Sequence, residues 1–468
     1  MGTLVHMVPA YGLDRNISRI ADTQGEALRK NGLQTFASAL IFMILAASTL
    51  NGAGRTGAAS GKNIAGGGES GKASPKAGYS FVPLPMLAYD AAKGILFGAM
   101  MNIYNFGDGS SYPDPRCSWY LEASGYTGGS QTYVASFDSG KLLPHVRFNA
   151  AGSYFRDKAM EFFGFNGYQT RYDTSIEDGF YMYGRGGANF KADFTGPICR
   201  GLYWDAGYHF NYLTVNEYSS SKYSGEETLF GLYRKWGILG DDMSGEKFSS
   251  AIRAGITYDS RDHEGVPGRG LLAGFHLITA PKFLGSSDSY VKFNASFIQY
   301  VPIIYSKLTF AYHIDYQDFI GKAPWYVLPF YSPGGPKYDN VHLGGTRIIR
   351  GMKYNRTTGT GVGYFNAELR WNLWNFNLWK QDIGVMLSGF CDGIRVFRGY
   401  DMTNVTGYAP DLYSSFTDTG THDRFHISGG GALKIILNRN FVLNIECARC
   451  ASRKDGTWAF YLNSGFYF

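Results

Sequence analysis

Segments of about ten residues with strictly alternating apolar and polar side chains make up most of the chain after Tyr79. Residues 307–317, KLTFAYHIDYQ, place leucine, phenylalanine, tyrosine and isoleucine at every second position, with lysine, threonine, histidine and aspartate between them. Residues 251–259 repeat the pattern. Because successive side chains of a β-strand point to opposite faces, this period of two predicts strands with one apolar and one polar face. The body of the chain is therefore predicted to be all-β.

Two all-β architectures fit this pattern: a soluble sandwich or propeller, and a transmembrane β-barrel whose apolar face contacts lipid. Composition favours the barrel, because the chain holds 62 glycines, 35 tyrosines and 34 phenylalanines while only 18% of its residues are charged. Outside the N-terminal region, no apolar run is long enough for a transmembrane helix. The roughly 390 residues from Tyr79 to Phe468 would supply about 16 strands and their loops.

The N-terminal region predicts secretion. Residues 36–50, FASALIFMILAASTL, form an apolar run that follows basic residues and precedes small ones, as in a signal peptide. We therefore predict an extended n-region plus signal peptide over residues 1–53, with a single membrane anchor as the alternative. Residues 54–78 are rich in glycine, serine and lysine and predict a flexible linker. They contain the spacing of a phosphate-binding loop, but Ala73 stands where that loop needs serine or threonine.

The sequence carries no recognisable catalytic or metal-binding arrangement. It contains neither H-E-x-x-H nor G-x-S-x-G, and its nine histidines are scattered without the spacing of metal ligands. Cys447 and Cys450 match C-x-x-C, but residues three apart in an alternating strand point to opposite faces. We therefore expect no enzyme activity, no metal and no cofactor. Much of the net charge of +6 comes from residues before Tyr79, so nucleic acid is not an expected partner.

The last segment, residues 458–468, reads WAFYLNSGFYF and predicts a closing strand. One face of this strand is expected to carry Trp458, Phe460, Leu462, Phe466 and Phe468. A final alternating strand that ends on phenylalanine is similar to that of bacterial outer-membrane proteins, where it is the recognition signal for barrel assembly. Together with the predicted signal peptide, this ending favours an outer-membrane barrel.

Four segments in the second half of the chain resemble motifs of one family. Residues 344–356, GGTRIIRGMKYNR, contain an Arg-Gly pair, and residues 387–396, LSGFCDGIRV, contain Phe-x-Asp. Residues 365–371, FNAELRW, lie between these two segments, and residues 256–270, ITYDSRDHEGVPGRG, lie upstream. These four segments resemble the sixth-loop, barrel-strand and turn motifs of the Omp85 superfamily, also called the surface antigen D15 family, which includes BamA and TamA. They occur along the chain in the order that the family shows.

The resemblance implies a 16-stranded antiparallel transmembrane β-barrel whose sixth extracellular loop folds inward. The loop motif would consist of Gly344, Gly345, Ile349, Arg350 and Gly351. Arg350 is expected to meet Asp392 and Glu368 on the lumen side, with Phe390 beside them. An arginine fork binds a carboxylate bidentately, and a narrow lumen screens such a pair only in part. The alternative is that Arg350 lies on an exposed loop, where an ion pair would contribute little to stability.

The chain departs from the family pattern in three places. Met352 stands where the family usually has an aromatic residue, and Gly393 directly follows Asp392. Family members also carry periplasmic POTRA domains ahead of the barrel, and residues 54–78 are too few to form one. In this respect the chain resembles POTRA-less members of the Bacteroidetes group.

The family implies a role in protein assembly, insertion or translocation at the bacterial outer membrane, as a subunit of a larger complex. Expected partners are outer-membrane lipid, other outer-membrane or periplasmic subunits, and client proteins. Two alternatives stay open: a structural scaffold barrel without transport activity, and a passive channel plugged by the Arg350 loop. A mitochondrial assembly barrel is disfavoured by the predicted signal peptide.

Overall fold

The computed structural model describes residues 77–468, apart from residues 91–92, 113, 141, 220–222, 224, 226, 241–245, 332–340, 346–347, 379–380, 404, 406–408, 438–440 and 467. The predicted signal peptide and nearly all of the predicted linker, residues 1–76, lie outside the described residues. The structural account therefore concerns the predicted barrel.

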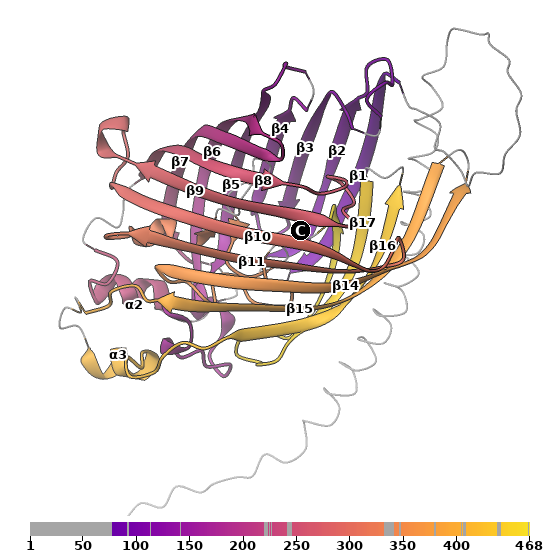
Figure 1. The fold of residues 1–468 in the computed structure, drawn as a ribbon. Coiled ribbons are helices and arrows are strands. Elements are labelled where there is room, and N and C mark those ends of the chain that lie inside the picture. The colour runs from indigo at the N-terminus through magenta and orange to yellow at the C-terminus, as the bar shows by residue number, and fades with distance from the viewer. Residues whose placement is uncertain are drawn as a thin grey trace, which may run out of the picture. The chain divides into compact units, whose positions relative to one another are not determined.

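Sixteen strands form one antiparallel sheet in which each strand pairs with its neighbours along the chain. They are β1 (Tyr79–Asp90), β2 (Gly94–Asn105), β3 (Cys117–Tyr126), β4 (Gln131–Asp138), β5 (Arg147–Glu161), β6 (Met182–Cys199), β7 (Leu202–Glu217), β8 (Lys247–Asp259), β9 (Gly270–Ala280), β10 (Tyr290–Ile304), β11 (Leu308–Ile320), β14 (Gly361–Leu378), β15 (Gln381–Arg398), β16 (His426–Leu437), β17 (Phe441–Cys450) and β18 (Trp458–Ser464). A separate short pair, β12 (Phe330–Tyr331) and β13 (Val341–His342), lies between β11 and β14. Figure 1 shows the sixteen strands as one strongly curved sheet. The prediction of an all-β fold with 16 antiparallel strands is confirmed.

The burial of side chains decides between a soluble β-protein and a membrane barrel. In β11, Phe310 and Ile314 are 37% and 54% exposed, whereas His313 and Asp315 are 5% and 1% exposed. The apolar face therefore points outward and the polar face inward, which reverses the arrangement of a soluble sandwich. An apolar outer face around a polar interior is the arrangement of a transmembrane barrel.

Charged residues of the inward face pair across neighbouring strands. Asp205 of β7 lies 3.1 Å from Arg253 of β8 and 2.8 Å from Nε2 of His276 of β9. Further along the same face, Nε2 of His209 lies 2.9 Å from a carboxylate oxygen of Asp193. Because an unpaired buried charge is costly, these contacts allow the interior of the sheet to stay polar.

The two ends of the sheet carry different connections. At one end the connections are mostly short, such as residues 200–201 and 305–307; at the other they are long. The long loops contain η1 (Gly167–Gln169), η2 (Asp178–Tyr181), α2 (Leu229–Lys235), η3 (Lys282–Leu284), η4 (Trp325–Val327) and α3 (Pro410–Phe416). Outer-membrane barrels have short periplasmic turns and long extracellular loops, so the end with α2 and α3 in Figure 1 is the extracellular end. No described helix is long and apolar enough to cross a membrane.

An aromatic cluster fills the extracellular end. Trp236 and Tyr233 are fully buried there, and the ring of Phe162 meets the ring of Tyr233 edge-on with 5.2 Å between centres. Trp325 and Phe230 bring the sixth loop and α2 into the same cluster, with 5.7 Å between their ring centres. Aromatic burial therefore joins the long loops into one packed cap.

The final segment differs from the predicted closing strand. Strand β18 ends at Ser464, and Gly465 follows with φ of +85°, a left-handed conformation that favours glycine. Phe460 is 78% exposed on the outer face, whereas Phe468 is only 6% exposed. The expectation that Phe466 and Phe468 continue the outward face of the strand is wrong, because the alternation ends where Gly465 turns the backbone.

The turned segment packs against the inner face of the sheet. The guanidinium of Arg370 lies 4.7 Å and 4.9 Å from the ring centres of Phe466 and Phe468, and its Nη2 donates to the carbonyl of Phe468 at 3.0 Å. Phe468 also packs with Ile298 and Tyr300 of β10. Trp458 and Leu462 lie within β18, at one end of the strand order. Among the described residues, no hydrogen-bonded pairing joins β18 to β1 at the other end.

Candidate functional site: the inward-folded sixth loop

The sixth extracellular loop, residues 321–360, connects β11 to β14 and turns into the interior of the sheet. Ile348, Ile349 and Arg350 are all 0% exposed. A cluster of apolar side chains holds the loop against β14 and β15: Leu343, Ile348, Ile349, Met352, Val362, Tyr364, Ile394 and Val396. Met352, which departs from the family pattern, is therefore a buried member of this cluster, and it supplies the apolar bulk that an aromatic residue would otherwise provide.

Arg350 meets Asp392 of β15 through a two-pronged contact. Its Nε and Nη2 donate to the two oxygens of Asp392 at 2.8 Å and 2.7 Å, and its backbone N–H donates to the same carboxylate at 3.1 Å. This fork geometry is specific to arginine, because lysine presents a single ammonium point. Backbone and side chain together fix the position of the loop relative to β15.

Two further carboxylates approach the other side of the guanidinium. Nη1 of Arg350 donates to Glu368 of β14 at 2.5 Å and to Glu446 of β17 at 3.2 Å. The ring of Phe390 lies 3.4 Å from the guanidinium carbon, so the cation is stacked on an aromatic face. The structure thus brings together Arg350, Asp392, Glu368 and Phe390, which the family motifs had grouped, and adds Glu446.

The excess of carboxylates is balanced by two more cations on the inner wall. Nε of Arg370 donates to Glu368 at 2.7 Å, and Nζ of Lys434 lies 3.7 Å from the same carboxylate. Three cations therefore face three carboxylates, and all six side chains are buried. The sequence motifs did not identify Arg370 and Lys434 as members of this site. Alternation places both residues on the inner face, but only the strand register shows that they lie beside Glu368.

Glycines allow the tip of the loop to approach the wall closely. Gly351 has φ of +86°, and its N–H donates to the hydroxyl of Tyr461 in β18 at 2.9 Å. Gly344 and Gly345 also have positive φ values of +88° and +70°. A Cβ on Gly345 would lie 2.1 Å from the ring of Tyr354, so the loop motif requires glycine there.

The other side of the loop is fixed to β5. Glu161, the last residue of β5, accepts the N–H of Tyr354 at 2.6 Å and the Nζ of Lys353 at 3.2 Å. Its carbonyl accepts from Asn355 at 3.1 Å. Because Arg350 contacts β14, β15 and β17 while the next residues contact β5, the loop ties together strands that are far apart in the sheet.

Arg356 extends the loop contacts into the cap. Its Nη1 donates to the carbonyl of Gly167 at 2.8 Å, and its Nε lies 3.6 Å from Asp455 in the β17–β18 loop. Burial lowers the pKa of Arg356. Burial by itself raises the pKa of Asp455, but hydrogen bonds from His426 and Tyr168 outweigh it and keep this pKa below its usual value. The carboxylate therefore stays charged opposite Arg356.

The opposite mouth of the lumen is lined by the β8–β9 turn, residues 260–269. Glu264 accepts from Nη1 of Arg147, at the start of β5, at 3.1 Å. Val266 packs against a small apolar cluster formed by Met386, Ile436 and Val442 on β15 to β17. The turn therefore touches both β5 and the strands that bind Arg350, and it lies within the segment that resembles the family's strand-and-turn motif.

Comparison with known proteins identifies the family. Residues 126–465 match the model of the Omp85 superfamily domain. The chain belongs to the Omp85 superfamily. No curated protein matches the chain. Members of this superfamily are outer-membrane proteins that transport or insert proteins, so the protein is an outer-membrane barrel.

Solved structures also match the chain, at low identity. A BamA from Haemophilus ducreyi lacking POTRA domains 1–3 gives a TM-score of 0.49 at 16% identity, covering 83% of this chain and 70% of that one. CdiB from Escherichia coli gives 0.46 at 10% identity, covering 83% and 61%, and CdiB from Acinetobacter baumannii gives 0.46 at 12%, covering 83% and 60%.

Proposed function

We propose that this Omp85 barrel acts in the assembly, insertion or translocation of proteins at the outer membrane, as a subunit of a larger complex. The supporting observation is the buried contact of Arg350 with Asp392, Glu368 and Glu446. A buried ion network rarely stabilises a fold more than apolar packing would, so the distinctive contribution of this one is to fix the position of the loop. Because these contacts hold the loop at one place inside the lumen, the loop forms a fixed part of the surface that a client protein would pass.

Depletion of the protein in its host, followed by quantitative outer-membrane proteomics, tests the proposal. Wild type, Arg350→Ala and Arg234→Ala would be supplied in parallel; Arg234 is an exposed arginine of α2 paired with Glu217 and serves as the matched control. We expect a defined set of outer-membrane or secreted proteins to disappear, and wild type and Arg234→Ala to restore them. Arg350→Ala, present in the membrane at equal amount, should fail to do so. If no other protein changes in level on depletion, the proposal is wrong.

A passive channel closed by its own segments is the second candidate. The observations that favour it are the sixth loop fixed between β5 and β15, and the turn 260–269 at the other mouth. Planar-bilayer recording separates the two functions. Deletion of residues 344–356 should produce a steady current if the loop is a plug, and depletion of such a channel would leave other outer-membrane proteins in place.

A further inference from the structure

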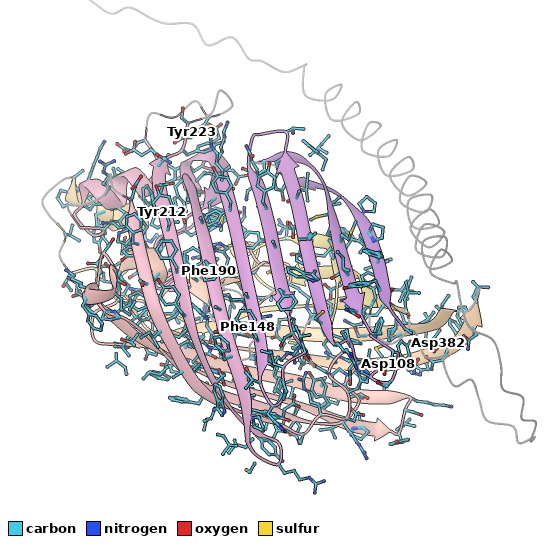
Figure 2. All side chains as sticks on the ribbon, turned by 90° about the horizontal axis from the view of Figure 1, so that it is seen from above. Asp108, Phe148, Phe190, Tyr212, Tyr223 and Asp382 are labelled. Carbon is cyan, nitrogen blue, oxygen red and sulfur yellow. The ribbon has the colours of Figure 1, made fainter. Side chains whose placement is uncertain are left out.

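Strands β14 and β15 continue beyond the neighbouring strand β11 at the periplasmic end. β11 pairs with β14 as far as Leu308, which lies opposite Trp371, whereas β14 runs on to Leu378 and pairs there with Gln381 of β15. Asn372 still donates its N–H to the turn before β11, but no described strand pairs with that side of residues 373–378. We call this side of residues 373–378 the free edge. Figure 2 labels Asp382 on the β14–β15 hairpin, at the same end as Asp108 of the β2–β3 turn.

A β-bulge keeps the aromatic residues of this extension on its outer face. Leu373 has no partner in β15, and the register shifts between Asn372 and Trp374. One extra residue moves the alternation by one position, so Trp371 before the bulge and Trp374 after it face the same way. Trp374 and Phe376 are 64% and 46% exposed. The extension therefore continues the apolar outer surface of the barrel, and asparagines occupy its other face.

The free edge lacks the charged residues and prolines that protect many exposed edges. Natural edges carry lysine, proline or inward-pointing charges that prevent pairing with other chains. Residues 371–378, WNLWNFNL, contain no charged residue and no proline. In an antiparallel ladder alternate residues direct both N–H and C=O to one side, so about half of these residues present backbone groups to the free edge. Lipid cannot satisfy such groups, whereas another strand can.

We propose that the free edge of β14, residues 373–378, binds an extended strand of a periplasmic or membrane-bound partner protein by strand addition. Six residues of strand span about 20 Å, enough for a partner strand of ordinary length. The partner strand has apolar side chains on the face that continues Trp374 and Phe376, and polar side chains on the face of Asn375 and Asn377. The partner would be another subunit of the larger complex, so this inference rests on the proposed function.

Photocrosslinking in living cells tests this surface. A photoreactive phenylalanine analogue replaces Asn377, and adducts are identified by mass spectrometry. Leu378 lies opposite Gln381 in the register, and the closing pair of a hairpin with two intervening residues is ordinarily hydrogen-bonded, so alternation directs the N–H of Asn375 to the free edge. Asn375→Pro removes this N–H, Asn375→Lys adds a protective charge, and Asn375→Ala changes only the side chain and is the control.

We expect one protein adduct whose attachment sites fall on alternate residues of a single segment. The amount of this adduct should be unchanged in Asn375→Ala and about tenfold lower in Asn375→Pro and Asn375→Lys. A decrease of this size is expected when hydrogen bonds of the added strand are lost. The inference is overturned if only lipid is labelled, if the attachment sites are scattered, or if both disruptive variants keep the adduct. Loss of the adduct in Asn375→Lys alone still supports it where Asn375→Pro fails to fold. If the adduct forms but depletion changes no other protein, the surface stands and the proposed function falls.

Discussion

At the scale of single residues, Arg350 is the charge on which the other buried charges depend. It is fully buried against Asp392, Glu368 and Glu446, while Arg370 of β14 and Lys434 of β16 approach Glu368 from the inner wall. Removing one member of such a network leaves buried charge without compensation. The energetic cost of replacing Arg350 therefore comes from the buried carboxylates that are left without their cation.

Arg350→Ala should lower the free energy of unfolding by about 3–5 kcal/mol, the cost of stranding a buried partner. Arg350→Lys should be destabilising as well, because lysine cannot bind both oxygens of Asp392 at once. Urea unfolding of the barrel in detergent, followed by the heat-dependent shift in gel mobility, measures the change. Arg234→Ala, which removes an exposed pair, should cost at most about 1 kcal/mol. Equal costs for both positions would contradict the buried network.

Gly351→Ala should destabilise the barrel by about 1–2 kcal/mol, because its φ of +86° is strained for any residue with a Cβ. The added Cβ would also meet the Cβ of Ala448 at 3.3 Å. Gly389 of β15 is the matched control: a Cβ there would contact nothing within 4 Å. Unfolding of the two alanine variants side by side gives the comparison, and a Gly389→Ala barrel as unstable as Gly351→Ala would contradict the conformational argument.

At the scale of elements, alternation in the sequence predicts the strands well but not the segments that leave the sheet. Strand β11 could be predicted because its side chains alternate without interruption. The inward turn of Phe466 and Phe468 could not, because it depends on the backbone conformation of Gly465 and on Arg370, which comes from a distant strand. Family motifs grouped Arg350 with Asp392 and Glu368; Glu446 belongs to none of the matching segments, and only the strand register brings it near.

The β8–β9 turn, residues 260–269, should restrict ion flow at the periplasmic mouth. Val266→Asp would place a carboxylate in the apolar cluster with Met386, Ile436 and Val442, and so detach the turn. We expect larger and noisier currents in planar bilayers than for wild type. Val266→Leu keeps the apolar contact and should behave like wild type. Indistinguishable currents for wild type and Val266→Asp would show that the turn does not obstruct the mouth.

At the scale of the whole molecule, the sixth loop connects the first third of the sheet with the last. Glu161 lies 192 residues before Lys353 in the chain, and Asp392 lies 42 residues after Arg350. Contacts of this kind cannot be read from local sequence patterns, because they depend on how far the sheet curves. The loop is therefore held by two walls at once.

Glu161→Gln and Arg350→Ala should be coupled through the loop that both residues hold. Once Arg350 is lost and the loop is loosened, the contacts of Glu161 contribute less, so the double variant should be less unstable than the two single effects combined. A coupling free energy of about 0.5–3 kcal/mol is expected for residues linked in this way. Unfolding of wild type, both single variants and the double variant measures it. Glu161→Gln combined with Arg234→Ala should be additive; additivity of the first pair would show that the two ends of the loop are independent.

The bulge at Leu373 makes the length of β14 matter more than its composition. Deleting Leu373 would restore a regular ladder with β15 and keep Trp374 and Phe376 on the face of Trp371, whereas deleting one residue after the bulge would exchange the two faces of the residues beyond it. A conservative replacement at either aromatic position would leave the faces unchanged. Among related chains, this hairpin should therefore accumulate substitutions freely, and single-residue length differences should occur at the bulge and hardly at all beyond it.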